Sequence, residues 1–168
     1  MIVAYVALGA NLGNPQQTIR HAIAALDEIT ETLLIQTSSL YRSAPHEARP
    51  SSSNEPQPDY INAVAELETK LSAPVLLTQL QLIEQAFGRD RNADVPRNAA
   101  RTLDLDLLLY GNLDLQTATL MLPHPRMHKR AFVLKPLLEI APQVMIPGIG
   151  LAAAYLGAVA GQAIERLT

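Results

Sequence analysis

Two carboxylates interrupt an apolar run of strand length in the second half of the chain, Arg101-Thr102-Leu103-Asp104-Leu105-Asp106-Leu107-Leu108-Leu109-Tyr110. Side chains alternate between the two faces of a strand. One face is therefore expected to carry Arg101, Leu103, Leu105, Leu107 and Leu109. The opposite face is expected to carry Thr102, Asp104, Asp106, Leu108 and Tyr110. This alternation makes the two aspartates neighbours, roughly 6.5–7 Å apart along the strand.

Asp104 and Asp106 have the chemistry of a site for one divalent cation or a close pair of them. Mg²⁺ prefers hard oxygen ligands and usually takes one or two carboxylates, while water and substrate phosphates complete its shell. The simpler alternative is that both aspartates lie on the solvated face of an edge strand. Because aspartate is depleted in strands, two of them in one strand favour the metal site.

The length of 168 residues suits one domain with a hydrophobic core, so we expect a single domain over residues 1–168. Hydrophobic residues make up 48% and charged residues 17%, which is typical of a globular protein. No apolar run approaches the roughly 18 residues of a membrane span, and the first residues show no leader pattern. The absence of cysteine excludes disulfides and thiolate metal sites. Together these features predict a cytoplasmic protein without a membrane partner.

The net charge of −3 argues against a general affinity for nucleic acid, yet the basic residues are unevenly placed. Eight of the thirteen lysines and arginines lie between positions 89 and 135. The segment before the aspartates contains Arg89, Arg91, Arg97 and Arg101. We expect these arginines to bind a small phosphorylated ligand bridged by metal to the aspartates, although each arginine alone fits a solvated surface equally well. With 4% aromatic residues, an RNA-binding sheet is disfavoured.

Hydrophobic periodicity and turn signals predict the order of the elements. Strands are expected over residues 2–8, 33–41, 60–69 and 101–110, and helices over residues 15–30 and 74–87. Helical spacing recurs over 132–140, and an Ala-rich helix is expected over 151–167. The long polar segment 43–59 has the composition of a lid or of a disordered insert. The order β-α-β-β-α-β with C-terminal additions predicts an α+β fold, a ferredoxin-like sandwich.

The buried faces of the two helices follow from the spacing of their apolar residues. Asn14 and Pro15 have the types expected at a helix start. The apolar stripe of the first helix is Ile19, Ala22, Ile23, Leu26 and Ile29. That of the second helix is Leu76, Leu80, Ile83 and Phe87. Gln81 and Glu84 are expected together on a different face of the second helix.

Several separated segments of the chain resemble the 6-hydroxymethyl-7,8-dihydropterin pyrophosphokinase family of folate biosynthesis. They are residues 4–12, 39–42, 59–63 and 101–106, Pro123-His124 and Pro142. The segment 101–106 is the most specific of these, and the resemblance covers nearly the whole chain. It implies transfer of the β,γ-diphosphate of ATP to the hydroxymethyl group of the dihydropterin, with release of AMP.

The resemblance also implies the roles of individual residues in catalysis and ATP binding. Asp104 and Asp106 would hold two Mg²⁺ ions, and Arg89 and Arg101 would stabilise the transferring group. Contacts to ATP are carried over to Gln81, Glu84, Arg89, Arg91, Arg101, His124 and Arg130. Such a set is physically sensible, because phosphoryl-type transfer depends on in-line positioning and on charge neutralisation by metals and arginines.

The pterin site is carried over in the same way. Asn62 would read the amide edge of the ring, and Tyr60 and Phe132 would form apolar or stacking walls. Backbone groups near Ser43, Ala44 and Pro45 would complete the site. The resemblance implies no obligatory protein partner besides these two small-molecule substrates.

The chain departs from the family pattern at several positions. Asn98 stands where the family usually has a tryptophan, and Ala99-Ala100 follows where Gly-Pro is common. Pro125 replaces a frequent aromatic residue, and the segments 43–59 and 88–101 are longer than usual. Loss of an aromatic contact would remove on the order of 0.5–1.5 kcal/mol of stacking energy. Weaker substrate binding with intact metal chemistry is the expected consequence.

The alternative to an enzyme is a ferredoxin-like sensor of a small ligand, or a family member that has lost activity while keeping nucleotide binding. A sensor has no need of paired metal ligands beside an arginine-rich segment. Asp104→Ala separates the two hypotheses, because it should abolish turnover in an enzyme and leave ligand binding nearly unchanged in a sensor.

Overall fold

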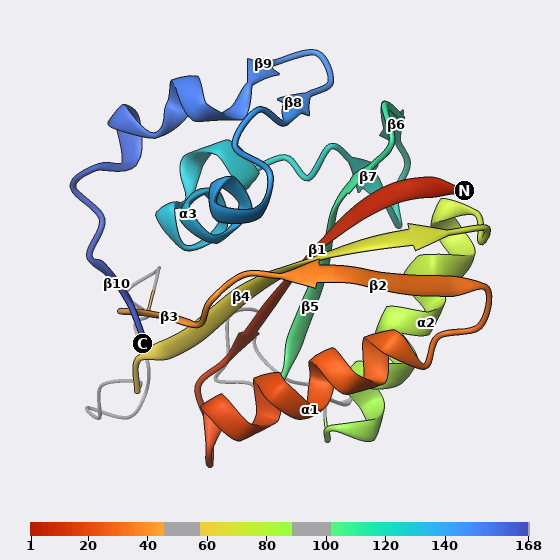
Figure 1. Cartoon of the computed structure of the whole chain (residues 1–168), viewed down its shortest axis with the longest axis horizontal. Coiled ribbons are helices and arrows are strands. Elements are labelled where there is room, and N and C mark those ends of the chain that lie inside the picture. The colour runs from red at the N-terminus through yellow and green to blue at the C-terminus, as the bar shows by residue number, and fades with distance from the viewer. Residues whose placement is uncertain (46–57, 89–101, 168) are drawn as a thin grey trace.

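The computed structural model describes residues 1–45, 58–88 and 102–167, which form a mixed α/β structure around an antiparallel sheet. The strands of this sheet are β1 (Ile2–Ala10), β2 (Thr32–Thr37), β3 (Tyr41–Ser43), β4 (Tyr60–Thr69), β5 (Asp104–Tyr110) and β10 (Ile164–Arg166). Their order is β10-β3-β4-β1-β5, and β2 also pairs with β4 (Figure 1). In the described sheet β1 and β4 are therefore central, and β5 is an edge strand.

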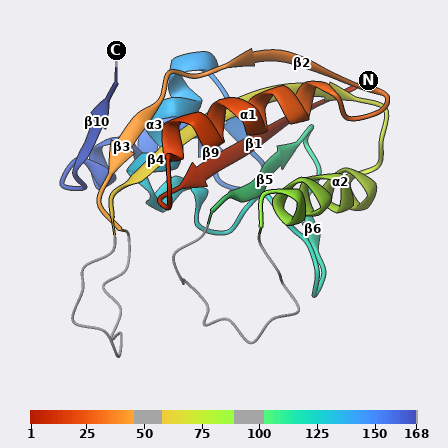
Figure 2. The same cartoon turned by 90° about the horizontal axis from the view of Figure 1, so that it is seen from below.

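Helices cover both faces of the sheet (Figures 1 and 2). The helices α1 (Pro15–Asp27) and α2 (Ala73–Ala86) pack on one face, and α3 (Ala131–Ile140) packs on the other with the C-terminal segment. The short elements are β6 (Leu115–Gln116), β7 (Met121–Leu122), η1 (Met127–Lys129), β8 (Met145–Ile146), β9 (Gly150–Leu151), η2 (Ala152–Tyr155) and η3 (Gly157–Val159). Among the described residues, no helix has both the length and the apolar character needed to cross a membrane.

Local sequence signals place the starts of both long helices. The Asn14 side chain accepts a hydrogen bond from the backbone N–H of Gln17, and Pro15 occupies the first position of α1. The Ser72 hydroxyl accepts in the same way from the N–H of Val75 at the start of α2. These caps satisfy N–H groups that lack a partner inside the helix. The helices predicted over residues 15–30 and 74–87 are confirmed, although α1 ends at Asp27 rather than near residue 30.

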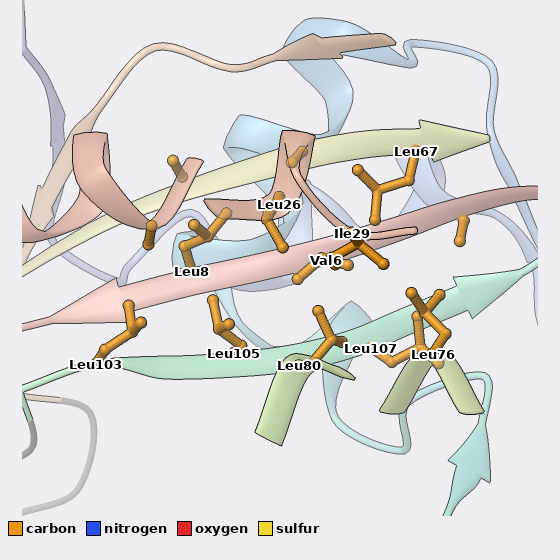
Figure 3. Close-up of a cluster of buried hydrophobic side chains, with 14 of the residues drawn as sticks. Val6, Leu8, Leu26, Ile29, Leu67, Leu76, Leu80, Leu103, Leu105 and Leu107 are labelled. Carbon is orange, nitrogen blue, oxygen red and sulfur yellow. The ribbon is translucent and has the colours of Figure 1, made fainter. Parts of the chain in front are cut away.

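The main core lies between the sheet and the pair α1 and α2, as Figure 3 shows. Val6 and Leu8 of β1 meet Leu67 of β4, Leu26 of α1 and Leu80 of α2 there. Burial of each such side chain stabilises the fold by roughly 1.5–3 kcal/mol. The predicted alternation of the strand over residues 60–69 and the predicted stripe of the first helix are both confirmed, with Ile23 only partly buried.

A register shift in β5 changes the faces predicted for its last residues. Tyr5 of β1 pairs with Leu109, whereas its neighbour Val6 pairs with Leu107, so Leu108 is an extra residue in β5. Leu109 consequently joins the cluster under α3 instead of lying with Leu107. Tyr110 packs on the opposite cluster instead of lying with Leu108. The alternation predicted from Leu103 through Leu107 holds, and the prediction for the two residues after the bulge is wrong.

Two further predicted elements differ from the structure. The strand expected over residues 33–41 is divided into β2 and β3, because Ser38 makes two hydrogen bonds to Val64 of β4. Its backbone N–H donates to the Val64 carbonyl oxygen at 2.8 Å, and its hydroxyl accepts from the Val64 N–H at 2.9 Å. The helix expected over residues 151–167 is wrong: this segment forms η2, η3 and β10. Gly157 and Gly161 interrupt the Ala-rich run, and glycine disfavours a helix interior.

Candidate active site

Three neighbouring strands bring Asn62, Gly9 and Asp104 into one row across the sheet. Gly9 of β1 is paired with Asn62 of β4 on one side and with Asp104 of β5 on the other. Directly opposed residues of antiparallel strands project from the same face of a sheet. Asn62 and Asp104 therefore stand on one face, separated by a residue that has no side chain.

The next row along the sheet repeats this arrangement with Val64, Ala7 and Asp106. Val64 is buried in the cluster under α3, so both rows lie on the face of the sheet that α3 covers. Asp104 and Asp106 are each half-buried on this face, as the alternation predicted. In these two rows β1 contributes only Gly9 and Ala7, so no large side chain of β1 stands between Asn62 and the aspartates.

Gly9 leaves a defined space beside Tyr60 and Asn62. A Cβ added at Gly9 would lie 3.5 Å from Asn62 Oδ1 and 3.9 Å from Tyr60 Cδ1. These are ordinary contact distances, so the two side chains border the space directly. A flat group placed over Gly9 would meet an amide and an aromatic ring together.

Asn62 is held by Ser43, the last residue of β3. Asn62 Nδ2 donates a hydrogen bond of 2.8 Å to Ser43 Oγ, and the two side chains are 4% and 6% exposed. This bond fixes the plane of the amide. The predicted contact of backbone groups near Ser43 with the pterin stays a prediction, while the serine hydroxyl serves to hold Asn62. Ala44 is exposed and Pro45 is half-buried beside it.

Glu84 does not share a face with Gln81 in the way that the sequence predicted. Gln81 is half-buried, whereas Glu84 is 0% exposed on the core side of α2. Glu84 Oε2 accepts a hydrogen bond of 2.9 Å from the backbone N–H of Leu105. A carboxylate can be buried when it finds such a donor, which apolar periodicity does not reveal.

His124 lies on the same side of the sheet as the aspartates and is neutral at pH 7. Burial lowers its pKa to about 4, helped by the charge of Arg130 and opposed by Asp104. Its Nδ1 accepts a hydrogen bond of 3.2 Å from the backbone N–H of Arg126. The ring proton is therefore on Nε2, which makes this nitrogen a hydrogen-bond donor.

Arg130 and Phe132 form a second group on the side of the sheet that α3 covers. The Arg130 guanidinium lies 5.4 Å from the centre of the Phe132 ring, a cation–π distance. Phe132 is half-buried at the start of α3 and packs on the cluster beneath that helix. An aromatic wall and a cation thus occur together on the face that holds the two aspartates.

A cavity of about 240 Å³ opens beside His124. It is bounded by the turn that contains Pro123 and Pro125 and by the turn between β8 and β9, residues 147–149. Asp114 and Gln116 supply polar groups to its wall.

The arginine-rich segment is not among the residues that the structure describes. Arg89, Arg91, Asn98 and Arg101 all lie outside the described ranges, so their predicted roles remain predictions. Within those ranges, no group of three or more His, Cys, Asp or Glu side chains is arranged to hold a metal ion. The pair of half-buried carboxylates nevertheless fits magnesium, which usually takes one or two carboxylates and fills its shell with water and phosphate oxygens.

The chain is similar in sequence to curated bacterial proteins over almost its whole length. It is 46% identical over 147 residues to the 2-amino-4-hydroxy-6-hydroxymethyldihydropteridine pyrophosphokinase of Haemophilus influenzae, covering 88% of this chain and 86% of that one. It is 42% identical over 163 residues to the protein of the same name from Pseudomonas aeruginosa, covering 97% and 95% of the two chains.

Solved structures of HPPK-DHPS proteins have the same fold. One in complex with substrates matches with a TM-score of 0.67 at 14% identity, over 94% of this chain. The Plasmodium falciparum HPPK-DHPS with pteroate matches with a TM-score of 0.70 at 13% identity. The chain spans only 43% and 42% of the length of those two proteins.

The fold therefore places the chain in the class of mixed α/β proteins with an antiparallel sheet that these structures represent. The family model described as 7,8-dihydro-6-hydroxymethylpterin-pyrophosphokinase (HPPK) matches residues 5–142. The chain belongs to the HPPK family.

Proposed function

We propose that this chain transfers the β,γ-diphosphate of ATP to the hydroxymethyl group of 6-hydroxymethyl-7,8-dihydropterin. The pterin hydroxyl oxygen bonds to the β-phosphorus, and the bond from that phosphorus to the oxygen shared with the α-phosphate breaks. The products are AMP and the pterin diphosphate, and the hydroxyl proton passes to solvent. Membership of the HPPK family supports this reaction. The row of Asn62, Gly9 and Asp104 is the structural observation that carries it.

Asp104 and Asp106 would hold the magnesium, and we assign two ions to them. When bound, magnesium neutralises charge on the triphosphate and orients its oxygens for in-line attack. The donor set supports this assignment, because the two carboxylates project from one face of β5 and are both half-buried. Oxygen ligands of this kind suit a hard cation.

The nucleotide would bind beside the aspartates, against Gln81, His124 and Arg130. His124 is neutral at pH 7 and has its proton on Nε2, so it can donate a hydrogen bond to a phosphate oxygen. Arg130 adds a positive charge next to the Phe132 ring. Arg89, Arg91 and Arg101 remain proposed phosphate contacts, with Arg89 and Arg101 stabilising the transferring group. The contact with ATP predicted for Glu84 is not part of this proposal, because Glu84 is fully buried.

The pterin would lie over Gly9, between the Tyr60 and Phe132 rings. An asparagine side chain offers two N–H donors and a carbonyl oxygen. Ser43 uses one N–H of Asn62, which leaves the other N–H and Oδ1 for the amide edge of the pterin. Ala44 and Pro45 follow Ser43 directly and would border the same ring.

We further propose that the fold is a ferredoxin-like sandwich and that residues 1–168 act as one pyrophosphokinase domain. The order β1, α1, the pair β2 and β3, β4, α2 and β5 supports the first statement, together with the central position of β1 and β4. ATP and the pterin would be its partners, without an obligatory protein partner.

A product assay tests the proposed function. The chain is incubated with Mg²⁺, ATP and 6-hydroxymethyl-7,8-dihydropterin, and AMP is separated from ADP, with Asp106→Ala run alongside. The expected result is one AMP for each pterin diphosphate and no product from Asp106→Ala. Formation of ADP would indicate an ordinary kinase. If neither nucleotide forms while ligands still bind, the chain is a sensor or has lost its activity.

A further inference from the structure

Glu84 is a fully buried acidic side chain whose hydrogen bond falls between the two aspartates. It lies in α2 with 0% of its surface exposed. Its Oε2 accepts a hydrogen bond of 2.9 Å from the backbone N–H of Leu105. Leu105 is the residue between Asp104 and Asp106, so the contact acts on the backbone that carries both carboxylates.

The position of β5 in the sheet explains why this N–H needs a side-chain partner. Along a strand, successive N–H groups point to opposite edges. Since the N–H of Leu105 points to α2, the N–H groups of Asp104 and Asp106 point to the other edge, where these residues pair with Gly9 and Ala7 of β1. The Asp-x-Asp backbone is thus held by β1 on one side and by Glu84 on the other.

The packing of α2 fixes where the Glu84 carboxylate lies. Leu76, Leu80 and Glu84 follow at intervals of four residues and share the buried face of the helix. The two leucines belong to the same core cluster as Leu105 and Leu107, and Figure 3 shows them against β5. The Glu84 backbone is therefore rigidly placed relative to Leu105.

An acidic side chain is an unusual solution for a core position. Burying a carboxylate costs free energy unless its oxygens are hydrogen-bonded, and a leucine of similar size would pack at this position without that cost. A hydrogen bond from a backbone N–H to a carboxylate is about twice as strong as one between neutral groups and is more directional than apolar contact. Glutamate at this position therefore serves to hold the β5 backbone at Leu105 more than to pack the core.

We infer that Glu84 is a positioning residue: by holding the N–H of Leu105 it fixes the separation and direction of the Asp104 and Asp106 carboxylates. This inference rests on the proposed function, because it assigns the two aspartates to magnesium. Groups that orient metal ligands from behind typically change metal affinity or activity by about 10- to 100-fold when removed. Glu84 would thus act through the backbone of β5 instead of touching the nucleotide.

The test compares two variants. Glu84→Gln keeps a carbonyl oxygen that can accept the hydrogen bond, whereas Glu84→Leu has a side chain of similar size without any acceptor. Three quantities are measured for each variant: kcat, the Mg²⁺ concentration for half-maximal activity, and hydrogen exchange of the Leu105 amide without metal. Mg²⁺ binding is also titrated with an ATP analogue whose α,β-bridging oxygen is a methylene group. Should Glu84→Leu fail to fold, Glu84→Ala takes its place.

Thr69→Val is the matched control. Thr69 Oγ1 is also a buried acceptor, for the backbone N–H of Leu71 at 3.0 Å, but it lies at the end of β4 away from Asn62. Glu84→Leu is expected to raise the Mg²⁺ requirement about 10- to 100-fold and to speed exchange at Leu105. Glu84→Gln should restore the larger part of both losses. Thr69→Val should lower the melting temperature without changing the Mg²⁺ requirement.

Two outcomes would overturn the inference. If Glu84→Leu and Thr69→Val differ only in melting temperature, Glu84 has a purely structural role. If Glu84→Gln and Glu84→Leu both weaken ATP binding with an unchanged Mg²⁺ requirement and normal exchange at Leu105, the charge of Glu84 contacts the nucleotide. A wild-type chain that forms no AMP would instead contradict the proposed function, and the exchange measurement at Leu105 would still decide whether Glu84 holds the β5 backbone.

Discussion

A side-chain hydrogen bond of 2.8 Å from Asn62 to Ser43 joins β4 to β3. Asn62 is the residue of β4 that is paired with Gly9 of β1. We expect Ser43→Ala to weaken pterin binding about tenfold, or about 1.4 kcal/mol, which is the size of one hydrogen bond. Without the hydroxyl, the Asn62 amide is free to rotate away from the ring edge. Titration calorimetry with the pterin and, separately, with Mg²⁺-ATP measures the effect, and the ATP affinity should not change.

Thr32→Val is the control for Ser43→Ala. It breaks a buried hydroxyl pair of 2.7 Å between Thr32 and Thr69, far along β4 from Asn62. Thr32→Val should lose about as much stability as Ser43→Ala does, and it should keep the wild-type affinities for the pterin and for Mg²⁺-ATP. Equal losses of pterin affinity in the two variants would show that the effect of Ser43→Ala is general loosening of the sheet.

Gly9→Ala is expected to weaken pterin binding by at least roughly tenfold while leaving the melting temperature nearly unchanged. The added methyl would meet Asn62 and Tyr60 at 3.5 and 3.9 Å, distances that the protein accommodates. Gly9 is also not among the glycines with positive φ, so alanine can adopt its backbone conformation. The ligand, however, would lose the space over β1. Equilibrium binding and thermal unfolding of the same preparation measure both effects.

Gly157→Ala is the matched control, because a Cβ at Gly157 meets no atom within 4 Å. It should change neither pterin binding nor stability appreciably. If Gly9→Ala binds the pterin as tightly as Gly157→Ala does, the ring does not lie over Gly9, and the proposed pterin site is misplaced.

The local parts of the fold could be predicted from the sequence because their signals are local. Asn14 with Pro15 marks a helix start, and the alternation from Tyr60 to Thr69 places one face in the core. The two aspartates on one face follow from the same period of two. A bulge has no such signal, so the faces of Leu109 and Tyr110 were predicted wrongly.

Contacts between distant segments could not be predicted in the same way. The Glu84 side chain is buried because Leu105, 21 residues later, supplies its donor, and the spacing of α2 contains no trace of that pairing. Gly9 looks like an ordinary turn glycine until the register sets it between Asn62 and Asp104. The useful signal in the sequence is a small residue, Gly9, near the end of a predicted strand, in a chain whose later strand carries Asp-x-Asp.

Glu139 predicts how stability depends on pH. Burial would raise its pKa, but hydrogen bonds from Tyr41 and Ser39 and the charge of Arg166 outweigh burial and lower it. A carboxyl with a lowered pKa in the folded state stabilises the fold above its unfolded pKa, and this contribution is lost as the pH falls through the folded value. Urea unfolding from pH 7 to pH 3 should therefore show a decline below about pH 4.5, the ordinary pKa of a glutamate.

Glu139→Gln separates this contribution from that of the other acidic residues. The variant should be less stable than the wild type at pH 7 and should lose less stability on acidification. Its C-terminal strand should also be more readily cleaved by protease, because Arg166 of β10 loses its ion pair with α3. Parallel pH profiles for the two proteins would contradict the assignment of the lowered pKa to Glu139.

Asp106→Asn tests whether the carboxylate pair holds magnesium. The Mg²⁺ complex of the methylene analogue of ATP, present at 100 times its dissociation constant, should stabilise the wild type by about 2.7 kcal/mol, because only the folded state binds it. Asp106→Asn should lose most of this stabilisation, and chelation of the metal should remove it from the wild type. Thermal unfolding with and without Mg²⁺ measures both.

Asp27→Asn, at the exposed end of α1, should behave as the wild type does. If Asp106→Asn keeps the full Mg²⁺ response, the metal binds elsewhere, and the pair on β5 is the solvated face of an edge strand.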